Sequence, residues 1–241
     1  MTKGNLAVSV VVPAYNQKGN IGKCIKGIEK NLLSYPEFKN FEIIVAEDGS
    51  TDGTFEEAKK IARKDRRVRV LHSGEKLGRG RAVCRAFSRA KGKIVAYVDA
   101  DQATETSQLP QLLKAIGPYD LATGSRYLSK SKATRSVSRL FFSSGYNFLV
   151  RLFLGSKVSD HQCGFKAFKA EVAKDLCRKA RDSHWFWDTE VLVLAQRAGY
   201  SIGEIPVVWK EQGSTTVRLG KDIVNMGRNI FRLWLRINFN R

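Results

Sequence analysis

Two aspartates, Asp99 and Asp101, stand one residue apart directly after the apolar run IVAYV. In an extended segment residues i and i+2 point to the same side, so both carboxylates are predicted to face one point beyond the strand end. Two like charges that close raise each other's pKa unless a cation lies between them. Mg²⁺ takes one or two carboxylates from a protein and completes its shell with water and phosphate. The spacing favours a divalent metal site, and the alternative is an exposed acidic turn in which Asp101 caps the next helix.

Two further loops carry polar residues. In EDGSTDGT (47–54) the glycines suit a tight turn and the residues after it suit a helix cap, but Asp48 lies at a predicted strand exit. A carboxylate there can accept hydrogen bonds from a nucleobase or a ribose. The loop GRGRAVCRAF (78–87) lacks the third glycine of a dinucleotide-binding fingerprint. As a basic loop that opens a helix, it can still hold phosphate through backbone amides.

The composition limits the partners of the chain. With 42 Lys and Arg against 23 Asp and Glu, its net charge is +19 over 241 residues. Such a field favours nucleic acid, an anionic membrane surface or a phosphorylated small molecule. The four cysteines are far apart, which supports neither a zinc site nor a disulfide framework, so we expect reduced cysteines and a cytoplasmic location. No secretory signal and no run of about 20 apolar residues is present, so we expect no membrane-spanning segment.

The elements that must position these residues follow an alternating pattern. Short β-branched runs predict strands, and longer amphipathic segments between them predict helices. The strands are expected at 8–12, 41–46, 68–71, 94–98 and 121–123, and the helices at 20–33, 54–64, 79–91 and 107–116. Repeated units of this kind predict an α/β fold with a doubly wound, mainly parallel sheet and ligands at the carboxyl ends of the strands. The polar strand exits would then meet at one edge.

The second half changes character. Residues 126–157 contain seven basic residues and no acidic one, and 138–154 predict an apolar helix. A helix near 171–181, another that opens at WFWDTE (185–190) and a strand at 205–209 follow. In the last segment helical periodicity places Lys221, Arg228, Arg232 and Arg236 on one face and Ile223, Met226, Ile230, Leu233, Trp234 and Ile237 on the other. We expect this basic amphipathic helix, 218–241, to lie on an anionic lipid surface rather than on the domain.

With PAYN, EDGSTDGT, DAD and GSR in that order, the chain resembles the family 2 glycosyltransferases of the GT-A fold. Among these it is most similar to synthases that load a sugar onto dolichyl phosphate. The segments ATRSVSRLFF, DHQCGFKAF, FWDTEVL and EIPVVWKEQGST resemble the dolichyl-phosphate glucosyltransferase branch. The resemblance covers roughly residues 7–216. It implies a catalytic domain at 1–217, with a nucleotide-sugar half at 1–125 and an acceptor half at 126–217.

The resemblance implies roles for individual residues. Asp99 and Asp101 would hold Mg²⁺ or Mn²⁺ on the diphosphate of a nucleotide sugar, UDP-glucose first and GDP-mannose second. The donor would also be bound by Pro13, Tyr15, Gln17, Asp48 and Arg79. The phosphate of a dolichyl or other polyprenyl acceptor would meet Arg126, Arg135 and Arg139. Two departures affect these roles: Gln17 stands where the family usually has Glu, and Glu47 precedes Asp48 where the family usually has a second Asp.

The acceptor decides which catalytic groups are needed. A phosphate monoester is largely dianionic at neutral pH, so it attacks without a general base. A sugar hydroxyl needs a base, for which Asp188 is the best candidate; the alternative role for Asp188 is a helix N-cap. Two other readings remain, a catalytically silent subunit and a basic nucleic-acid-binding protein. Because the sequence has no helix-turn-helix, RNP or zinc signature, we expect no nucleic-acid partner. The expected location is peripheral, on the cytoplasmic face of a membrane.

Overall fold

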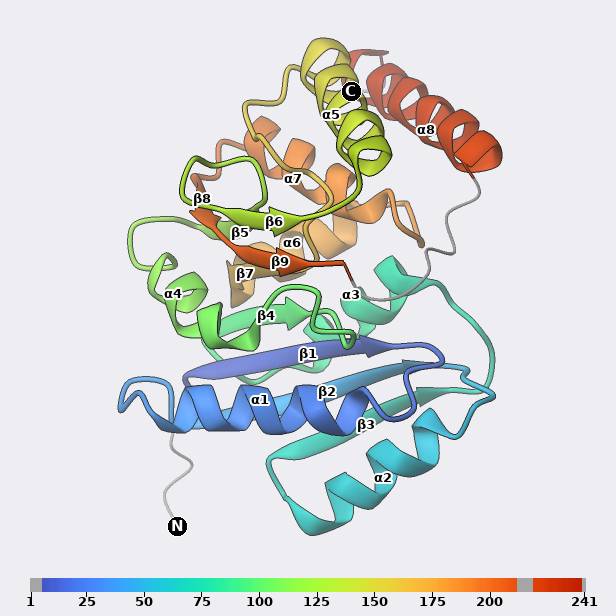
Figure 1. The fold of residues 1–241 in the computed structure, drawn as a ribbon. Helices are drawn as coiled ribbons and strands as arrows, with labels where there is room; N and C mark the ends of the chain where they lie inside the picture. Colours follow the sequence, from blue (N-terminus) through green and yellow to red (C-terminus); the bar gives the residue numbers. More distant parts are fainter. Residues whose placement is uncertain (1–5, 212–218, 240–241) are drawn as a thin grey trace.

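The computed structural model describes the backbone of residues 6–211 and 219–239 and the side chains of 6–211 and 225–239. A seven-stranded sheet crosses the molecule in the order β3-β2-β1-β4-β7-β5-β8, and β6 pairs with β9 in a small second sheet (Figure 1). The strands are β1 (Val8–Ala14), β2 (Phe41–Asp48), β3 (Val68–Ser73), β4 (Ile94–Val98), β5 (Leu121–Ser125), β6 (Lys132–Thr134), β7 (Phe165–Lys169), β8 (Ile202–Pro206) and β9 (Val208–Lys210). The helices are α1 (Ile21–Leu33), α2 (Thr54–Lys64), α3 (Arg79–Arg89), α4 (Leu109–Lys114), α5 (Val137–Leu154), α6 (Ala170–Lys179), α7 (Trp187–Arg197) and α8 (Leu219–Phe239), with a 3₁₀ turn at Thr106–Gln108.

Helices cover both faces of the large sheet. On β1, Val10 and Val12 face a core shared with α1 and α4, whereas Val11 faces a core shared with α3, α6 and α7. The whole of β2 is buried. Strands enclosed on both sides need apolar residues at successive positions, which is why the sequence shows continuous apolar runs rather than alternation. The predicted α/β fold with a doubly wound, mainly parallel sheet is confirmed.

Strand β7 was not predicted from the sequence. It runs antiparallel between β4 and β5 and places Lys166 opposite Tyr97. One sheet therefore joins residues from both sides of position 125. The predicted strand at 205–209 is also wrong in detail, because β8 ends at Pro206 and β9 begins at Val208 in the other sheet.

Helix α8 lies beside α5 rather than apart from the domain (Figure 1). Ile230 and Leu233 are buried in a cluster with residues of α5 and α7, and Met226, Trp234 and Ile237 pack against it. On the side expected to meet lipid headgroups, Arg236 pairs with Glu190 at 2.6 Å and Arg232 with Asp182 at 3.6 Å. The predicted orientation of the helix is therefore wrong: this apolar face is covered by protein. The side chains of Lys221 and Ile223 lie outside the described residues.

The expectation that no disulfide forms is also wrong. Cys84 on α3 and Cys177 on α6 form a disulfide, with a Cα–Cα distance of 5.4 Å across 93 residues of sequence. The two helices pack on the same face of the sheet, which no local spacing reveals. The cysteine spacing therefore no longer argues for a cytoplasmic location. None of the helices in the described part of the chain is both long and apolar enough to cross a bilayer.

Candidate active site

Asp99 and Asp101 lie at the carboxyl end of β4, as predicted, but not on an extended segment. The backbone N–H of Gln102 donates to the carbonyl of Asp99, so residues 99–102 form a turn. Asp101 uses Oδ1 to accept the backbone N–H of Ala103 at 2.9 Å. It does not cap a helix, since the N-cap of α4 is Gln108. The relative placement of the two carboxylates is therefore set by this turn and not by strand alternation.

Asp99 is held through both its side chain and its backbone. Its Oδ1 accepts a hydrogen bond from the guanidinium of Arg79 at 2.6 Å, and its backbone N–H donates to the carbonyl of Gly164. A Cβ at Gly164 would lie 1.7 Å from Oδ2, so any side chain there would have to displace the Asp99 carboxylate. Burial raises the pKa of Asp99 to about 6; Asp101 and Asp188 add to the rise and Arg79 opposes it.

Arg79 joins Asp99 to Asp188. Its guanidinium forms ion pairs with both carboxylates and lies over the rings of Tyr97 and Trp185, 5.1 and 4.9 Å from their centroids. Burial alone would lower the pKa of Arg79, but the two carboxylates outweigh it and raise the pKa above its usual value. The guanidinium is thus a fixed cation at the sheet edge.

Asp188 lies in the first turn of α7 and is 2% exposed. Its carboxylate accepts from the hydroxyl of Tyr97, the ammonium of Lys166 at 2.8 Å and Arg79. Burial alone would raise its pKa, but Arg79 and Lys166 hold the pKa below the usual value. The alternative role as a helix cap is wrong, because Phe186 is the N-cap and makes no side-chain cap bond.

The residues expected around the nucleoside lie at the ends of β1 and β2. Pro13 lies within β1, Tyr15 is exposed, and the Nζ of Lys76 lies 3.5 Å from the centroid of the Tyr15 ring. The backbone N–H of Gln17 donates to Thr54, which ties this loop to the start of α2. Contacts of these residues with a base stay a prediction.

Asp48 has a different set of contacts. It is buried, and its two carboxylate oxygens accept the backbone N–H groups of Leu77 and Gly78 at 2.7 and 3.0 Å. These bonds fix the loop that leads into Arg79. Both carboxylate oxygens of Asp48 thus accept backbone N–H groups, and its contact with a nucleoside stays a prediction.

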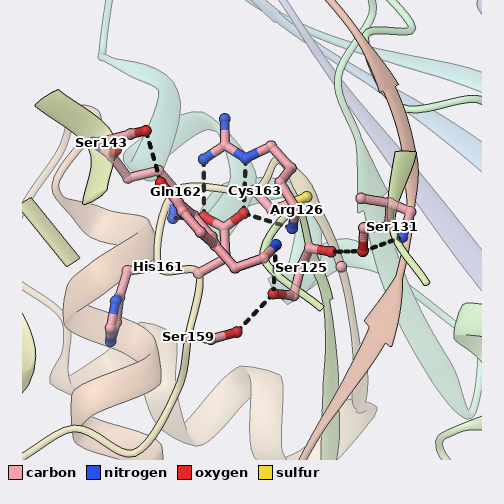
Figure 2. Close-up of polar contacts among 12 residues, drawn as sticks. Ser125, Arg126, Ser131, Ser143, Ser159, His161, Gln162 and Cys163 are labelled. Atoms are coloured by element: carbon pink, nitrogen blue, oxygen red, sulfur yellow. Dashed lines mark hydrogen bonds and ion pairs between the residues drawn. The ribbon is translucent and has the colours of Figure 1, made fainter. Parts of the chain in front are cut away.

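Arg126 does not present a free guanidinium. Its Nε and Nη2 donate to the two oxygens of Asp160 at 2.7 and 2.8 Å, and its backbone N–H donates to the same carboxylate (Figure 2). Asp160 is fully buried, and burial alone would raise its pKa, yet Arg126 holds the pKa below the usual value. This bidentate pair anchors the GSR segment. A direct contact of Arg126 with phosphate would have to share the guanidinium with Asp160.

Arg135 and Arg139 differ in their partners. Arg135 donates to Tyr127 and Ser143 at 3.3 and 3.2 Å, and among the described residues it has no carboxylate partner. Arg139 pairs with Glu211 at 3.1 Å. Of the three predicted acceptor arginines, Arg135 has the charge that the described part of the chain leaves uncompensated.

The donor set suits a hard divalent cation. Among the described residues no group of three metal-ligating side chains is present. Asp99 and Asp101 each commit one carboxylate oxygen to an ordered donor, and among the described residues the other oxygen of each has no hydrogen-bond partner. Beside a nucleotide, Mg²⁺ is usually coordinated by one or two carboxylates, and water and phosphate oxygens complete its coordination shell. The residues present therefore fit such an ion.

Sequence reasoning missed four residues of this site: Tyr97, Asp160, Gly164 and Lys166. Three of them lie in or beside DHQCGFKAF, which the sequence singled out as a motif without assigning its residues. A lysine inside an apolar strand was a signal, because a fully buried lysine needs a partner.

Comparison with known proteins gives consistent results. Residues 9–177 match the model of "Glycosyl transferase family 2". Glycosyltransferase AglD of Haloferax volcanii is 46% identical over 98% of this chain, which spans only 38% of that protein. The dolichyl-phosphate β-glucosyltransferase of Drosophila melanogaster is 33% identical over 96% of this chain and 76% of its own length.

The solved structures that match include glucosyl-3-phosphoglycerate synthase of Mycobacterium tuberculosis in complex with Mn²⁺, UDP and glucosyl-3-phosphoglycerate. It has a TM-score of 0.66 and 20% identity, and covers 95% of this chain and 78% of its own. This likeness shows a shared fold.

Proposed function

This chain belongs to glycosyl transferase family 2, and we propose that it transfers a hexose from a nucleotide sugar to a dolichyl or other polyprenyl phosphate. The Drosophila relative, which matches over most of both chains, carries the name of such an activity with glucose as the sugar. UDP-glucose is therefore the first donor to test, and GDP-mannose the second.

The burial and the hydrogen bonds of Asp188 favour a phosphate acceptor over a hydroxyl acceptor. A hydroxyl acceptor needs a general base within reach of its proton. Asp188, the best candidate, is 2% exposed and already accepts hydrogen bonds from three donors. A phosphate acceptor is already anionic and needs only to be neutralised and oriented. The arrangement thus supports a phosphate acceptor better than a hydroxyl acceptor.

The donor is bound at the carboxyl edge of the sheet in this proposal. Asp99 and Asp101 would hold a divalent cation, Mg²⁺ or Mn²⁺, which would act as a Lewis acid on the diphosphate. Arg79 fixes Asp99, and its own charge is already paired with Asp99 and Asp188. Tyr15 and Gln17, at the open end of β1, are the candidates for contacts with the nucleoside.

Arg135 presents the acceptor, with Arg126 and Arg139 around it. An oxygen of the lipid phosphate forms a bond to the anomeric carbon of the hexose. The bond from that carbon to the diphosphate breaks, and the leaving nucleoside diphosphate takes the electron pair. One in-line displacement of this kind inverts the anomeric carbon. No proton has to be removed from the nucleophile.

Exposed apolar side chains on α5 and α8 support a membrane surface as the place of reaction. We define the α5–α8 apolar surface by Leu140, Phe141, Phe148, Leu152, Phe153, Phe231, Leu235 and Phe239, all of them exposed. The two helices lie side by side (Figure 1), and Arg151 and Arg228 on them are exposed as well. An apolar surface with basic residues suits an anionic bilayer, with the protein attached peripherally.

The test is a donor panel. The full chain is incubated in detergent with polyprenyl phosphate and labelled UDP-glucose, GDP-mannose or UDP-N-acetylglucosamine, with and without EDTA. We expect label in the lipid fraction from one donor, lost with EDTA and with Asp101→Ala. The same panel with free sugars in place of the lipid tests the hydroxyl acceptor. Label on a free sugar, and none on the lipid, would refute the proposal.

A further inference from the structure

Lys166 carries a charge in the middle of the sheet. It lies on β7, is fully buried, and its Nζ lies 2.6 Å from the carbonyl of Cys163 and 2.8 Å from Asp188. The hydroxyl of Tyr97, opposite Lys166 in the pairing of β7 with β4, is 3.3 Å away. The ammonium of Lys166 therefore has three hydrogen-bond partners from the protein: a carbonyl, a carboxylate and a hydroxyl.

This ammonium begins a row of alternating charges that ends at the metal site. Lys166 pairs with Asp188, Asp188 with Arg79, and Arg79 with Asp99. The members come from β7, α7, α3 and the end of β4, so the row joins four elements that are distant in sequence. Only Asp99, at the end of the row, has a side chain with substantial exposure, 31%, while the other three are between 0% and 11% exposed.

Stability alone does not account for the row. Removing charges from water is costly, and a buried ion pair can often be replaced by apolar groups with no loss of stability. What an apolar replacement cannot do is hold a guanidinium in one place. Asp188 receives Arg79 on one oxygen, while its other oxygen receives Lys166 and Tyr97. Asp188 thus has a fixed position, and Arg79 has a fixed partner.

We propose that Lys166 and Asp188 are positioning residues of the donor site, which hold Arg79 so that Arg79 in turn holds the carboxylate of Asp99 for the donor's diphosphate and its cation. The proposal rests on the proposed function, because it assigns the residues to a nucleotide-sugar site. Lys166 keeps Asp188 charged and oriented, and Asp188 keeps Arg79 from turning into solvent. Neither residue is expected to touch the donor.

A purely structural role makes a different prediction. If the row only compensates buried charge, removing Lys166 and Asp188 together should leave a neutral core and restore both stability and binding. If the row positions Arg79, the double variant should recover stability without recovering donor affinity. The two roles separate in the double variant.

The experiment uses the full chain with Lys166→Met, Asp188→Asn and the two changes together. Affinity for UDP is measured by calorimetry in the presence of Mn²⁺, and stability is measured by urea unfolding. We expect each single change to lower stability and to weaken UDP binding at least tenfold. The double variant should unfold near the parent's urea midpoint and still bind UDP at least tenfold more weakly. Binding by the double variant within twofold of the parent would overturn the proposal.

A matched control lies three residues away on the same strand. Lys169 pairs with Asp120 at 2.8 Å, is 37% exposed, and in the described part of the chain forms no ion pair with a member of the row. Lys169→Met should bind UDP as the parent does. If the Lys166→Met single variant fails to fold, Arg79→Gln and the double variant test the proposal instead. Both should lose at least tenfold in affinity for UDP. Affinity retained by either variant would refute the proposal.

The outcomes also separate this inference from the proposed function. A parent that binds neither UDP nor GDP with Mn²⁺ would end both. A parent that binds UDP and transfers sugar, together with variants that bind equally well, would end the positioning role alone.

Discussion

Gly164 and Asp99 are in such close contact that the structure has no room for a side chain at Gly164: a Cβ there would lie 1.7 Å from Asp99 Oδ2 and 2.7 Å from the Arg79 guanidinium. The backbone of Gly164, ahead of β7, thus lies against the carboxylate that we propose as a metal ligand. The contact explains why a motif in the second half of the chain belongs to a site formed by the first.

Gly164→Ala should therefore displace the Asp99 carboxylate with little effect on the rest of the fold. We expect a loss of roughly a hundredfold in kcat/KM, because a displacement of about 1 Å at a reacting centre has that effect. Sugar transfer is measured with the active donor of the panel. Gly145→Ala in α5 is the control, since nothing lies within 4 Å of a Cβ there, and it should keep full activity. Equal activity of both variants would contradict the role of Gly164.

Arg135→Ala should weaken use of the acceptor more than use of the donor. Arg135 lacks a carboxylate partner among the described residues, so its charge is available for phosphate. A charged hydrogen bond contributes about 1.5–3 kcal/mol, which corresponds to roughly a tenfold or greater rise in the KM for polyprenyl phosphate. Arg178→Ala, on the exposed face of α6, should change neither KM. A variant with a raised donor KM and an unchanged acceptor KM would show that Arg135 is misassigned.

The α5–α8 apolar surface should bind lipid. Phe141 and Phe153 are 74% and 52% exposed on α5, so changing both to Ser should not disturb the core. Burial of a phenylalanine contributes about 1.5–3 kcal/mol, so partitioning onto vesicles should fall at least tenfold. The measurement is co-sedimentation with phosphatidylcholine vesicles, with and without phosphatidylserine. Leu33→Ser removes a 52% exposed side chain from α1, on the other side of the molecule (Figure 1), and should leave binding unchanged.

His161 should make the fold sensitive to acid. It is buried between Asn147 and Ser156, and burial lowers its pKa to about 4. Between the unfolded value near 6.5 and the folded value, the unfolded chain binds a proton that the folded protein does not. Stability therefore falls as the pH drops through this window, by about 3 kcal/mol from this group.

Urea unfolding between neutral pH and pH 4 measures this effect. His161→Gln should make the free energy of unfolding depend less steeply on pH, because about one proton fewer is taken up on unfolding. Equal pH dependence of the free energy of unfolding in the parent and in His161→Gln would contradict this role of His161.

Reduction of the disulfide should destabilise the protein. Cys84 and Cys177 close a loop across 93 residues, and such a cross-link contributes roughly 2–4 kcal/mol by restricting the unfolded chain. We expect dithiothreitol to lower the urea midpoint of the parent. The double variant Cys84→Ser, Cys177→Ser should unfold at the reduced parent's midpoint and show no response to dithiothreitol. A parent that unfolds identically with and without reductant would contradict the cross-link.

The sequence by itself determined the fold class, the order of the strand exits and the place of Asp99 and Asp101 at one of them. It did so because these features depend on neighbouring residues: a strand buried on both faces needs a continuous apolar run, and a parallel sheet brings successive carboxyl ends to one edge. The order of PAYN, EDGSTDGT, DAD and GSR therefore pointed to the correct family.

The tertiary structure alone decided which charges are free and which apolar faces are covered. Lys166, Asp160 and Gly164 became site residues only when β7 entered the sheet beside β4, and Arg126 proved to be paired once Asp160 lay against it. Periodicity showed that α8 has an apolar face, but not whether protein or lipid covers it. The physical reason is the same in each case: burial and ion pairing depend on contacts between distant segments, which local sequence patterns do not record.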